Sequence, residues 1–252
     1  MQITAALVCD PGRFRSNNQD NFLFGGDYLP AENRGIKGVY TDASDGRAPY
    51  IAAVFDGLGG YCEGEKAAEA AAEAFSAADF SPFASSTSED WFNDLNDALV
   101  SAAKERRVGV SGTTAAAILI LSGILHAVNV GDSRIYLCRD RELRLLSEDH
   151  TNWKLLEELE LRNRQPELTQ YLGMDSEFRI IPHAACLRLQ DGDTLLICTD
   201  GLHSILDDDT LLQRMRKGRD GPQALSDLLR EARDRGAKDN ITAIMVTCTD
   251  TE

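Results

Sequence analysis

The chain has 252 residues, of which 43% are hydrophobic and 27% are charged, so it is long and apolar enough for one sizeable core. Its net charge is −15, and an acidic surface repels nucleic-acid phosphates and anionic lipids, so neither is an expected partner. No apolar run approaches the roughly 18 residues that span a membrane, and no basic leader opens the chain. We therefore expect a soluble, cytoplasmic monomer, with residues 1–252 forming a single domain.

The cysteines indicate a reducing environment. There are six of them, and no two have C-x-x-C spacing: Cys9, Cys62, Cys138, Cys186, Cys198 and Cys248. Most lie in apolar, strand-like runs, which is typical of buried free thiols. Cys62 lies near a glycine turn but has no obvious activating base, so we do not expect it to be a nucleophile.

The first half of the chain predicts strands at 2–9, 22–24 and 51–55 and helices at 63–78 and 89–107. The run 51–55 is wholly apolar, as in a buried strand, and the alanines of 63–78 recur at helical spacing. Residues 25–49 are rich in Gly, Asp and Pro, which predicts a long exposed hairpin connection. Residues 81–88 indicate a surface loop between the two helices.

The second half predicts a β-rich block and then helices. Strands are expected at 115–121, 124–130, 135–138 and 143–146, and their short turns indicate an antiparallel meander. A helix at 152–160 and an irregular stretch at 161–178 come next, and then strands at 179–189 and 194–199. Helices at 208–216 and 222–234 precede a final strand at 241–248. Pro222 suits the first position of its helix, and Asp207 to Asp209 suit a cap.

The turn after strand 51–55 is the most informative stretch. The strand ends at Asp56, and Gly57 follows it. A carboxylate beside bare backbone suits a hard cation, because a glycine carbonyl can approach closely. An ordinary strand-to-helix turn explains the same residues. A dinucleotide-binding loop does not, since it would need Gly at Cys62, and Asp56 would repel a pyrophosphate.

Acidic residues recur at the ends of apolar strands: Asp20, Asp56, Asp132, Asp200 and Asp239. One such acid is ordinary turn chemistry. Five are better explained by a shared oxygen-rich site, because converging carboxylates repel one another unless cations neutralise them. The chain has no Cys/His set, so Mg²⁺ or Mn²⁺ is favoured over zinc. Arg15 precedes Asp20, and its planar guanidinium suits a phosphate group.

Seven segments then resemble, in order, the motifs of one family: 15–20 (RSNNQD), 55–60 (FDGLGG), 111–114 (SGTT), 131–134 (GDSR), 147–151 (SEDHT), 199–201 (TDG) and 239–242 (DNIT). The chain resembles the metal-dependent serine/threonine phosphatases of the PP2C (PPM) family, most closely the bacterial single-domain members. The resemblance implies an α+β fold, a four-layer α-β-β-α sandwich of two central antiparallel sheets flanked by helices. It also implies a flap at about 152–175 beside the active site.

The resemblance implies a role for each acidic residue. Asp56 would bridge two Mn²⁺ or Mg²⁺ ions, Gly57 would give its carbonyl to the second ion, and Asp200 and Asp239 would complete the protein ligands of the first. Asp20 would act through metal-bound water. Asp132, with Asp200, would hold a third, weaker ion. Arg15 would hold the phosphate, so Arg15, Asp20 and Asp56 are the expected catalytic residues.

The implied activity is hydrolysis of phosphoserine and phosphothreonine in proteins by a metal-activated water at a two- or three-metal site. The expected partners are phosphorylated proteins, including a serine/threonine kinase and its targets. The alternative is a catalytically weak PP2C-like module that binds phosphoproteins. The retained Asp56, Asp200 and Asp239 argue against that alternative, and Arg15 argues against a structural calcium site.

The chain departs from the family pattern at several positions. Leu58 and Tyr61 stand where His is found in some or many members. Gln19 stands where Glu is frequent, and Gln170 where Arg is usual. Leu58 leaves the source of the leaving-group proton open. His203 lies close to Asp200 in the sequence, but an ordinary structural role is its expected one.

Overall fold

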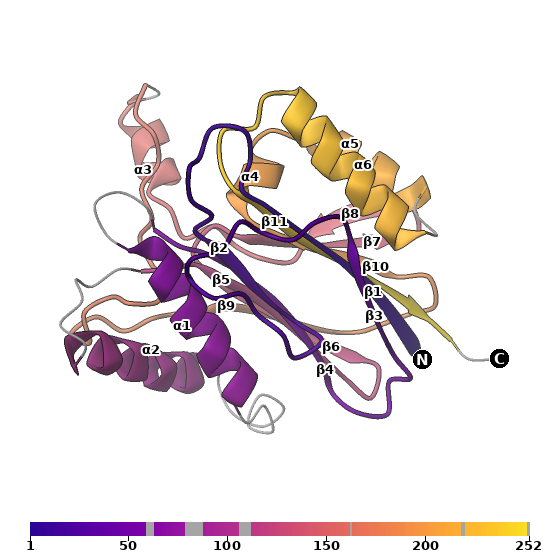
Figure 1. The fold of residues 1–252 in the computed structure, drawn as a ribbon, viewed down its shortest axis with the longest axis horizontal. Helices are drawn as coiled ribbons and strands as arrows, with labels where there is room; N and C mark the ends of the chain where they lie inside the picture. The colour runs from indigo at the N-terminus through magenta and orange to yellow at the C-terminus, as the bar shows by residue number, and fades with distance from the viewer. Residues whose placement is uncertain (59–62, 79–87, 106–111, 162, 218–219, 251–252) are drawn as a thin grey trace.

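The computed structural model describes residues 1–58, 63–78, 88–105, 112–161, 163–217 and 220–250. Two antiparallel sheets face each other, and helices cover their outer faces (Figure 1). The strands are β1 (Gln2–Asp10), β2 (Asp20–Phe24), β3 (Tyr40–Ser44), β4 (Tyr50–Asp56), β5 (Ala115–Leu121), β6 (Ile124–Val130), β7 (Arg134–Arg139), β8 (Glu142–Leu145), β9 (His183–Arg188), β10 (Thr194–Cys198) and β11 (Ile241–Thr249). The helices are α1 (Gly64–Ala77), α2 (Ser88–Glu105), α3 (Trp153–Glu158), α4 (Asp200–His203), α5 (Asp208–Lys217) and α6 (Gly221–Asp234). This is the predicted four-layer arrangement.

The sheets are built from neighbours in sequence and from the two ends of the chain. One six-stranded sheet has the order β3-β1-β11-β10-β7-β8, and one five-stranded sheet has the order β2-β4-β5-β6-β9. The predicted meander is confirmed, because β5 pairs with β6 and β7 with β8 across short turns. Strand β1 pairs with β11 along its whole length, which joins the N-terminal segment to the C-terminal one.

Three apolar clusters follow from the strict alternation of side chains along buried strands. In β1, Ile3, Ala5 and Leu7 point into the cluster between the sheets, whereas Ala6 and Val8 point into the cluster under α4, α5 and α6. The third cluster lies between the five-stranded sheet and the helix pair α1 and α2. The central strands of each sheet are therefore buried on both faces, which explains why they are almost continuously apolar.

An aromatic group anchors the helix pair α1 and α2 to β4. Phe75 of α1 is fully buried, and its ring centroid lies 5.0 Å from that of Phe55 and 5.1 Å from that of Trp91. These rings, with Phe92, pack edge to face, the arrangement that aromatic quadrupoles favour. Because Phe55 immediately precedes Asp56, this packing fixes the end of β4.

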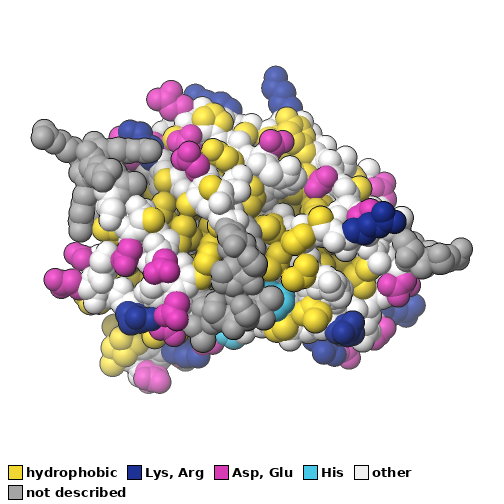
Figure 2. Space-filling model, turned by 90° about the horizontal axis from the view of Figure 1, so that it is seen from below, with side chains coloured by type: hydrophobic (Ala, Val, Ile, Leu, Met, Phe, Trp, Pro, Cys, Tyr) yellow, Lys and Arg dark blue, Asp and Glu magenta, His cyan; other side chains and the backbone are white. Residues whose placement is uncertain are grey.

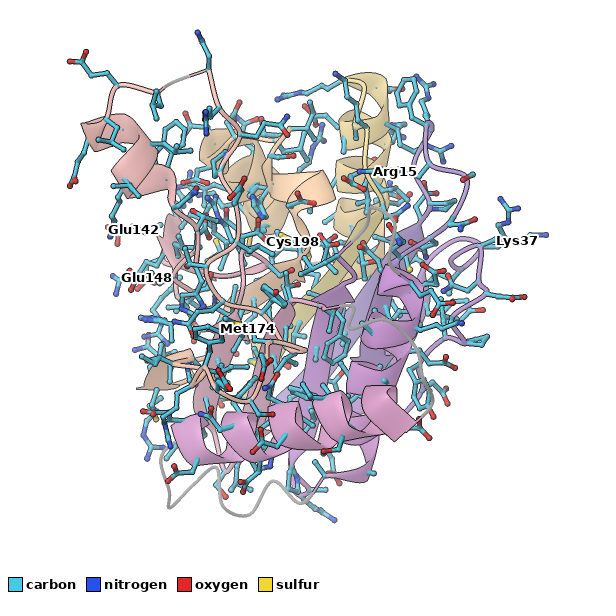
Figure 3. The ribbon with its side chains drawn as sticks, turned by 90° about the vertical axis from the view of Figure 1, so that its left-hand side faces the viewer. Arg15, Lys37, Glu142, Glu148, Met174 and Cys198 are labelled. Atoms are coloured by element: carbon cyan, nitrogen blue, oxygen red, sulfur yellow. The ribbon has the colours of Figure 1, made fainter. Side chains whose placement is uncertain are left out.

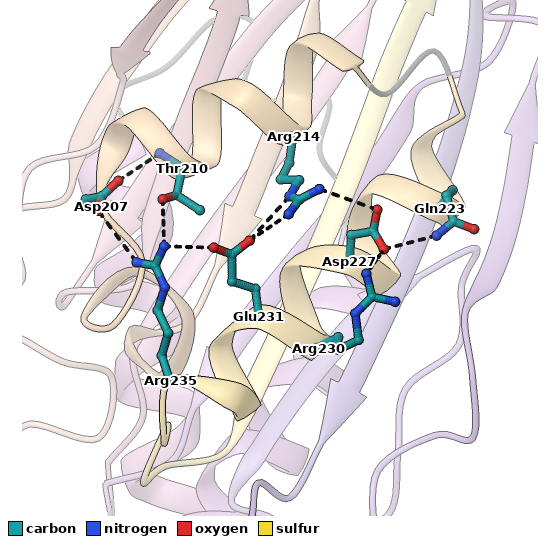
Figure 4. Close-up of polar contacts among 8 residues, drawn as sticks. All are labelled: Asp207, Thr210, Arg214, Gln223, Asp227, Arg230, Glu231 and Arg235. Carbon is teal, nitrogen blue, oxygen red and sulfur yellow. Dashed lines mark hydrogen bonds and ion pairs between the residues drawn. The ribbon is translucent and has the colours of Figure 1, made fainter.

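On the opposite outer face, charged side chains join α5 to α6 (Figure 4). Glu231 accepts hydrogen bonds from Arg214 at 2.9 Å and from Arg235 at 2.7 Å. The Arg214 guanidinium lowers the pKa of the Glu231 carboxyl. Asp207 accepts a hydrogen bond from the Thr210 N–H at 2.8 Å, so the predicted cap of α5 is confirmed.

Some sequence-based predictions were wrong or incomplete. The stretch 25–49 contains β3, which the Gly, Asp and Pro content hid, and β3 is an edge strand with a largely exposed sequence. The short helix α4 was not predicted. The strand expected at 179–189 is shorter and begins at His183. The loop expected at 81–88 and Tyr61 lie outside the described residues, apart from Ser88, which opens α2.

Two surface properties complete the description. Five cysteines in the described residues are free, and four are buried as expected, but Cys186 is exposed. In the described part of the chain, no helix combines the length and apolarity that a membrane crossing requires. On the face drawn in Figure 2, acidic side chains are spread along the outline, and hydrophobic side chains gather towards the middle.

Candidate active site

Strand pairing brings two of the predicted acids together in the five-stranded sheet. Strand β2 begins at Asp20, strand β4 ends at Asp56, and these two residues are register partners. Asp56 extends β4 into the turn, and Gly57 continues the contact, since its N–H donates to the Gln19 carbonyl at 3.1 Å. A Cβ at Gly57 would collide with the backbone of Gly64, so only glycine fits this approach.

The six-stranded sheet delivers the other three acids to the same end. Arg134 of β7 opposes Cys198 of β10, so the same register continued by two residues would place Asp132 opposite Asp200. Strand β11, the other neighbour of β10, starts just after Asp239. Antiparallel strands therefore bring three acids that are distant in sequence to one edge.

These residues line one open pocket of about 300 Å³, formed by Arg15, Gln19, Asp56, Gly57, Leu58, Thr114, Asp132, Leu168, Asp200, Asp239 and Asn240. Asp20 lies beneath it and is 2% exposed. Figure 3 shows Arg15 beyond the end of β10, which is marked by Cys198. The structure thus brings together all six polar residues expected at the site, together with Gly57.

Threonine and serine side chains fix the Asp56 backbone. Thr114 Oγ1 accepts the Asp56 N–H at 3.1 Å, and Thr113 Oγ1 donates to the Asp56 carbonyl at 2.9 Å. The Thr114 hydroxyl also lies 2.7 Å from the Ser133 hydroxyl. Ser133 neighbours Asp132, so one network of buried hydroxyls connects the backbones at Asp56 and Asp132. This is what Thr113, Thr114 and Ser133 do within the two predicted motifs.

Asp20 is held from the other sheet. Its Oδ2 accepts a hydrogen bond from Thr199 Oγ1 at 2.8 Å, and Thr199 Oγ1 in turn accepts the Thr242 N–H at 3.0 Å. Burial, together with the charges of Asp200 and Asp239, raises the pKa of Asp20 to about 8. A carboxyl in this setting favours a nearby positive charge.

The neighbouring acids are perturbed in the same direction. Burial raises the pKa of Asp132 to about 7, with Asp200 adding to the shift, and it raises the pKa values of Asp56 and Asp200 as well. Asp200 Oδ1 is buried and has no hydrogen-bond partner among the described residues. Crowded carboxylates with an orphaned oxygen are the donor chemistry that a hard divalent cation satisfies.

One of the expected metal ligands, Asp239, already has a positively charged partner. In the described residues, no three Asp, Glu, His or Cys side chains form a ready metal-ligand set. Asp239 is engaged by Arg15, whose Nη2 lies 2.6 Å from Asp239 Oδ2. Both groups are partly exposed, at 50% and 38%. A bound cation would therefore compete with Arg15 for the Asp239 carboxylate.

Asn240 is a site residue for which no separate role was predicted from the sequence. Its Nδ2 donates to the carbonyls of Pro11 and Asn17 at 2.9 and 3.0 Å, and its Oδ1 accepts the Gln19 N–H at 2.8 Å. It thereby closes the loop that carries Arg15. The signal in the sequence was an Asn directly before a strand, which by itself predicts only a turn.

The described positions that depart from the family pattern, Gln19, Leu58 and Gln170, have local partners. Gln19 Nε2 donates to Glu65 at 2.9 Å, and Gln170 Oε1 accepts the Ile181 N–H at 2.6 Å, so Gln170 supports its own loop. Leu58 lines the pocket and donates its backbone N–H to the Gly112 carbonyl. His203 faces the loop of Asp132, because its Nε2 lies 2.9 Å from the Asp132 carbonyl oxygen.

Comparisons with known proteins agree with this geometry. The family model described as protein phosphatase 2C matches residues 40–245. The serine/threonine phosphatase stp of Listeria monocytogenes is 28% identical over 258 residues, which cover 96% of this chain and 94% of that protein. The protein phosphatase PhpP of Streptococcus pneumoniae is 27% identical over 256 residues, which cover 96% of each chain.

A solved structure supports the fold. The catalytic domain of PstP, a serine/threonine phosphatase of Mycobacterium tuberculosis solved with two manganese ions, superposes with a TM-score of 0.73. The alignment covers 99% of this chain and all of that one, at 24% identity. At that identity the likeness establishes the shared architecture.

Proposed function

The chain belongs to the protein phosphatase 2C family, and from this premise we propose that it hydrolyses phosphoserine and phosphothreonine in proteins. The observation that carries the proposal is the pocket itself. Four acids and Arg15 line it, a fifth acid lies beneath it, and they come from both sheets. The named phosphatases that match nearly the whole chain support the same class of substrate.

Mn²⁺ or Mg²⁺ fits this donor set. Asp56 and the Gly57 carbonyl would hold two ions between them, and Asp200 and Asp239 would complete the protein ligands of one, with Asp132 available to a third. The raised pKa values and the orphaned Asp200 oxygen support this assignment. When bound, the ions would activate a water for in-line attack on phosphorus and neutralise phosphoryl charge.

Side chains of the protein would bind the phosphoryl group and orient water. Arg15 would exchange Asp239 for phosphoryl oxygens, and its fixed guanidinium fork would orient the group for attack. Asp20, held by Thr199, would orient water beneath the pocket. Leu58 has no ionisable group, and water within the site would supply the proton for the leaving serine or threonine oxygen.

The stretch 152–175 would act as a flap for protein substrates. It is joined to the body by backbone pairs between Thr151 and Leu168 and between Thr113 and Leu172, and Leu168 reaches the pocket. Helix α3 projects from the body (Figure 1), and Trp153 and Leu159 are 47% and 57% exposed. Exposed apolar side chains on the stretch that also carries the pocket residue Leu168 suit a protein substrate more than a small phosphoester.

The test is hydrolysis of p-nitrophenyl phosphate and of phosphoserine, phosphothreonine and phosphotyrosine peptides with EDTA, Mg²⁺ or Mn²⁺. We expect metal-dependent turnover that favours the serine and threonine peptides. Asp239→Asn should lower it at least about hundredfold, since a metal ligand is lost, while the exposed Asp234→Asn retains it. A folded wild type without turnover in any metal would refute the proposal and favour the phosphoprotein-binding module.

A further inference from the structure

The loop between β6 and β7 carries Asp132 into the pocket, and its position depends on how its backbone is held. The β7–β10 ladder stops at Arg134 and Cys198. Continued by two residues, its register would set Asp132 against Asp200, but the chain turns into α4 at Asp200 instead. The backbone of Asp132 therefore needs a partner other than a ladder strand.

His203 supplies that partner. It is the last residue of α4, and its Nε2 lies 2.9 Å from the Asp132 carbonyl oxygen. A carbonyl only accepts, so the ring donates, which places the proton on Nε2. Burial, with Arg134 nearby, lowers the pKa of His203 to about 4, so the ring stays neutral near pH 7. The bond joins the element that starts with Asp200 to the loop that carries Asp132.

The other contacts of this loop lie on either side of Asp132. The Gly131 N–H donates to His150 Nδ1 at 3.2 Å, and the Gly131 carbonyl accepts the His150 N–H at 3.0 Å. Ser133 is held by the Thr114 hydroxyl. Among the described residues, His203 is thus the side chain bonded to the Asp132 carbonyl. Orienting that peptide unit also fixes the direction in which the Asp132 side chain leaves the backbone.

We propose that His203 is a positioning residue, which aims the Asp132 carboxylate into the pocket and so sets the affinity of the weakest-bound divalent ion. The inference rests on the proposed function. A group that orients a metal ligand typically changes metal affinity by about ten- to hundredfold. A merely space-filling histidine would change stability and leave metal affinity unaltered.

The experiment measures Mn²⁺ binding by isothermal titration calorimetry, with turnover of p-nitrophenyl phosphate recorded in parallel. His203→Phe keeps a ring but removes the donor, and His203→Gln keeps a donor. Asp132→Asn and the double variant with His203→Phe close a thermodynamic cycle. His126→Phe, in the body of β6, is the matched control. If His203→Phe does not fold, as judged by thermal unfolding, His203→Leu, which also lacks a donor, replaces it throughout.

We expect His203→Phe to weaken the weakest Mn²⁺ binding step about tenfold and to raise the half-saturating Mn²⁺ for turnover equally. His203→Gln should restore most of it, and His126→Phe should match the wild type. In the Asp132→Asn background, His203→Phe should not weaken Mn²⁺ binding any further. The proposal would be overturned if His203→Phe left Mn²⁺ affinity unchanged, or if it lowered Mn²⁺ affinity as much in the Asp132→Asn protein as in the wild type.

Mn²⁺ binding and phosphoester hydrolysis by the wild-type protein distinguish a failure of this inference from a failure of the proposed function. Wild-type protein that binds Mn²⁺ but hydrolyses no phosphoester would refute the phosphatase proposal, and the binding cycle would still decide the role of His203. Wild-type protein that binds no Mn²⁺ would overturn both.

Discussion

Replacing Arg15 by alanine separates the two partners that the guanidinium is expected to have. In the structure, Arg15 bonds to Asp239 at 2.6 Å, with side-chain exposures of 50% and 38%. An ion pair this exposed contributes at most about 1 kcal/mol to folding. The variant should therefore keep the wild-type fold, and its free energy of unfolding should change by less than about 1 kcal/mol.

The effect on substrate should be larger. Charge-assisted hydrogen bonds to a phosphoryl group are worth about 1.5–3 kcal/mol. Their loss should lower kcat/KM for p-nitrophenyl phosphate by about 10- to 150-fold, mainly through KM. Arg15→Lys should recover only part of this, because an ammonium cannot reproduce the bidentate fork.

The effect on metal should have the opposite sign. Asp239 is no longer held by a guanidinium in Arg15→Ala, so Mn²⁺ should bind to the variant as tightly as to the wild type or up to about fivefold more tightly. Calorimetry and steady-state kinetics at saturating Mn²⁺ measure the two effects separately. Arg13→Ala, an exposed arginine in the same loop, is the control and should leave both unchanged.

Wild-type kcat/KM in Arg15→Ala would refute the role of Arg15 in holding phosphate. A lower Mn²⁺ affinity in Arg15→Ala would show that Arg15 supports the metal site and does not compete for Asp239.

Two further outcomes follow from the core and the acids. Phe75→Ala should cost about 4 kcal/mol of unfolding free energy in urea denaturation, because a fully buried ring is removed, and a loss under about 1 kcal/mol would contradict the packing. With EDTA, stability should fall as pH rises from about 4 to about 8, since the folded pKa of Asp20 lies at about 8 and the native state therefore holds its proton longer than the unfolded chain does. Asp20→Asn should reduce this dependence, measured as the difference between the urea midpoints at pH 5 and at pH 8. A wild-type stability that does not change between these pH values would contradict a buried Asp20 carboxyl without a compensating charge.

Most helices and strands could be predicted from the sequence, because apolar runs and the turns that end them lie within a few neighbouring residues. The apolar runs at 115–121 and 124–130 match β5 and β6 to the residue, since each run is closed by a short turn. Strand β3 was not predicted, because its own composition is polar and carries no strand signal. It is an edge strand that is defined by its hydrogen-bonded pairing with β1.

The candidate site shows the same division. Asp20, Asp56, Asp132, Asp200 and Asp239 could be named from the sequence, because each stands at a strand end beside turn residues. Their convergence is a property of register. The pairing of Asp20 with Asp56 and the β7–β10 ladder decide it, and no spacing along the chain encodes either one.

The sequence by itself identified the acids and the arginine, because residue chemistry can be read from short stretches, and the resemblance of its ordered motifs to one family implied the fold class. Only the tertiary structure decided which partners hold them. Asn240 closes the Arg15 loop, Thr199 holds Asp20, and His203 holds the Asp132 carbonyl. These contacts join residues 71 to 221 positions apart, and such pairs meet only when distant strands have paired and the two sheets have packed.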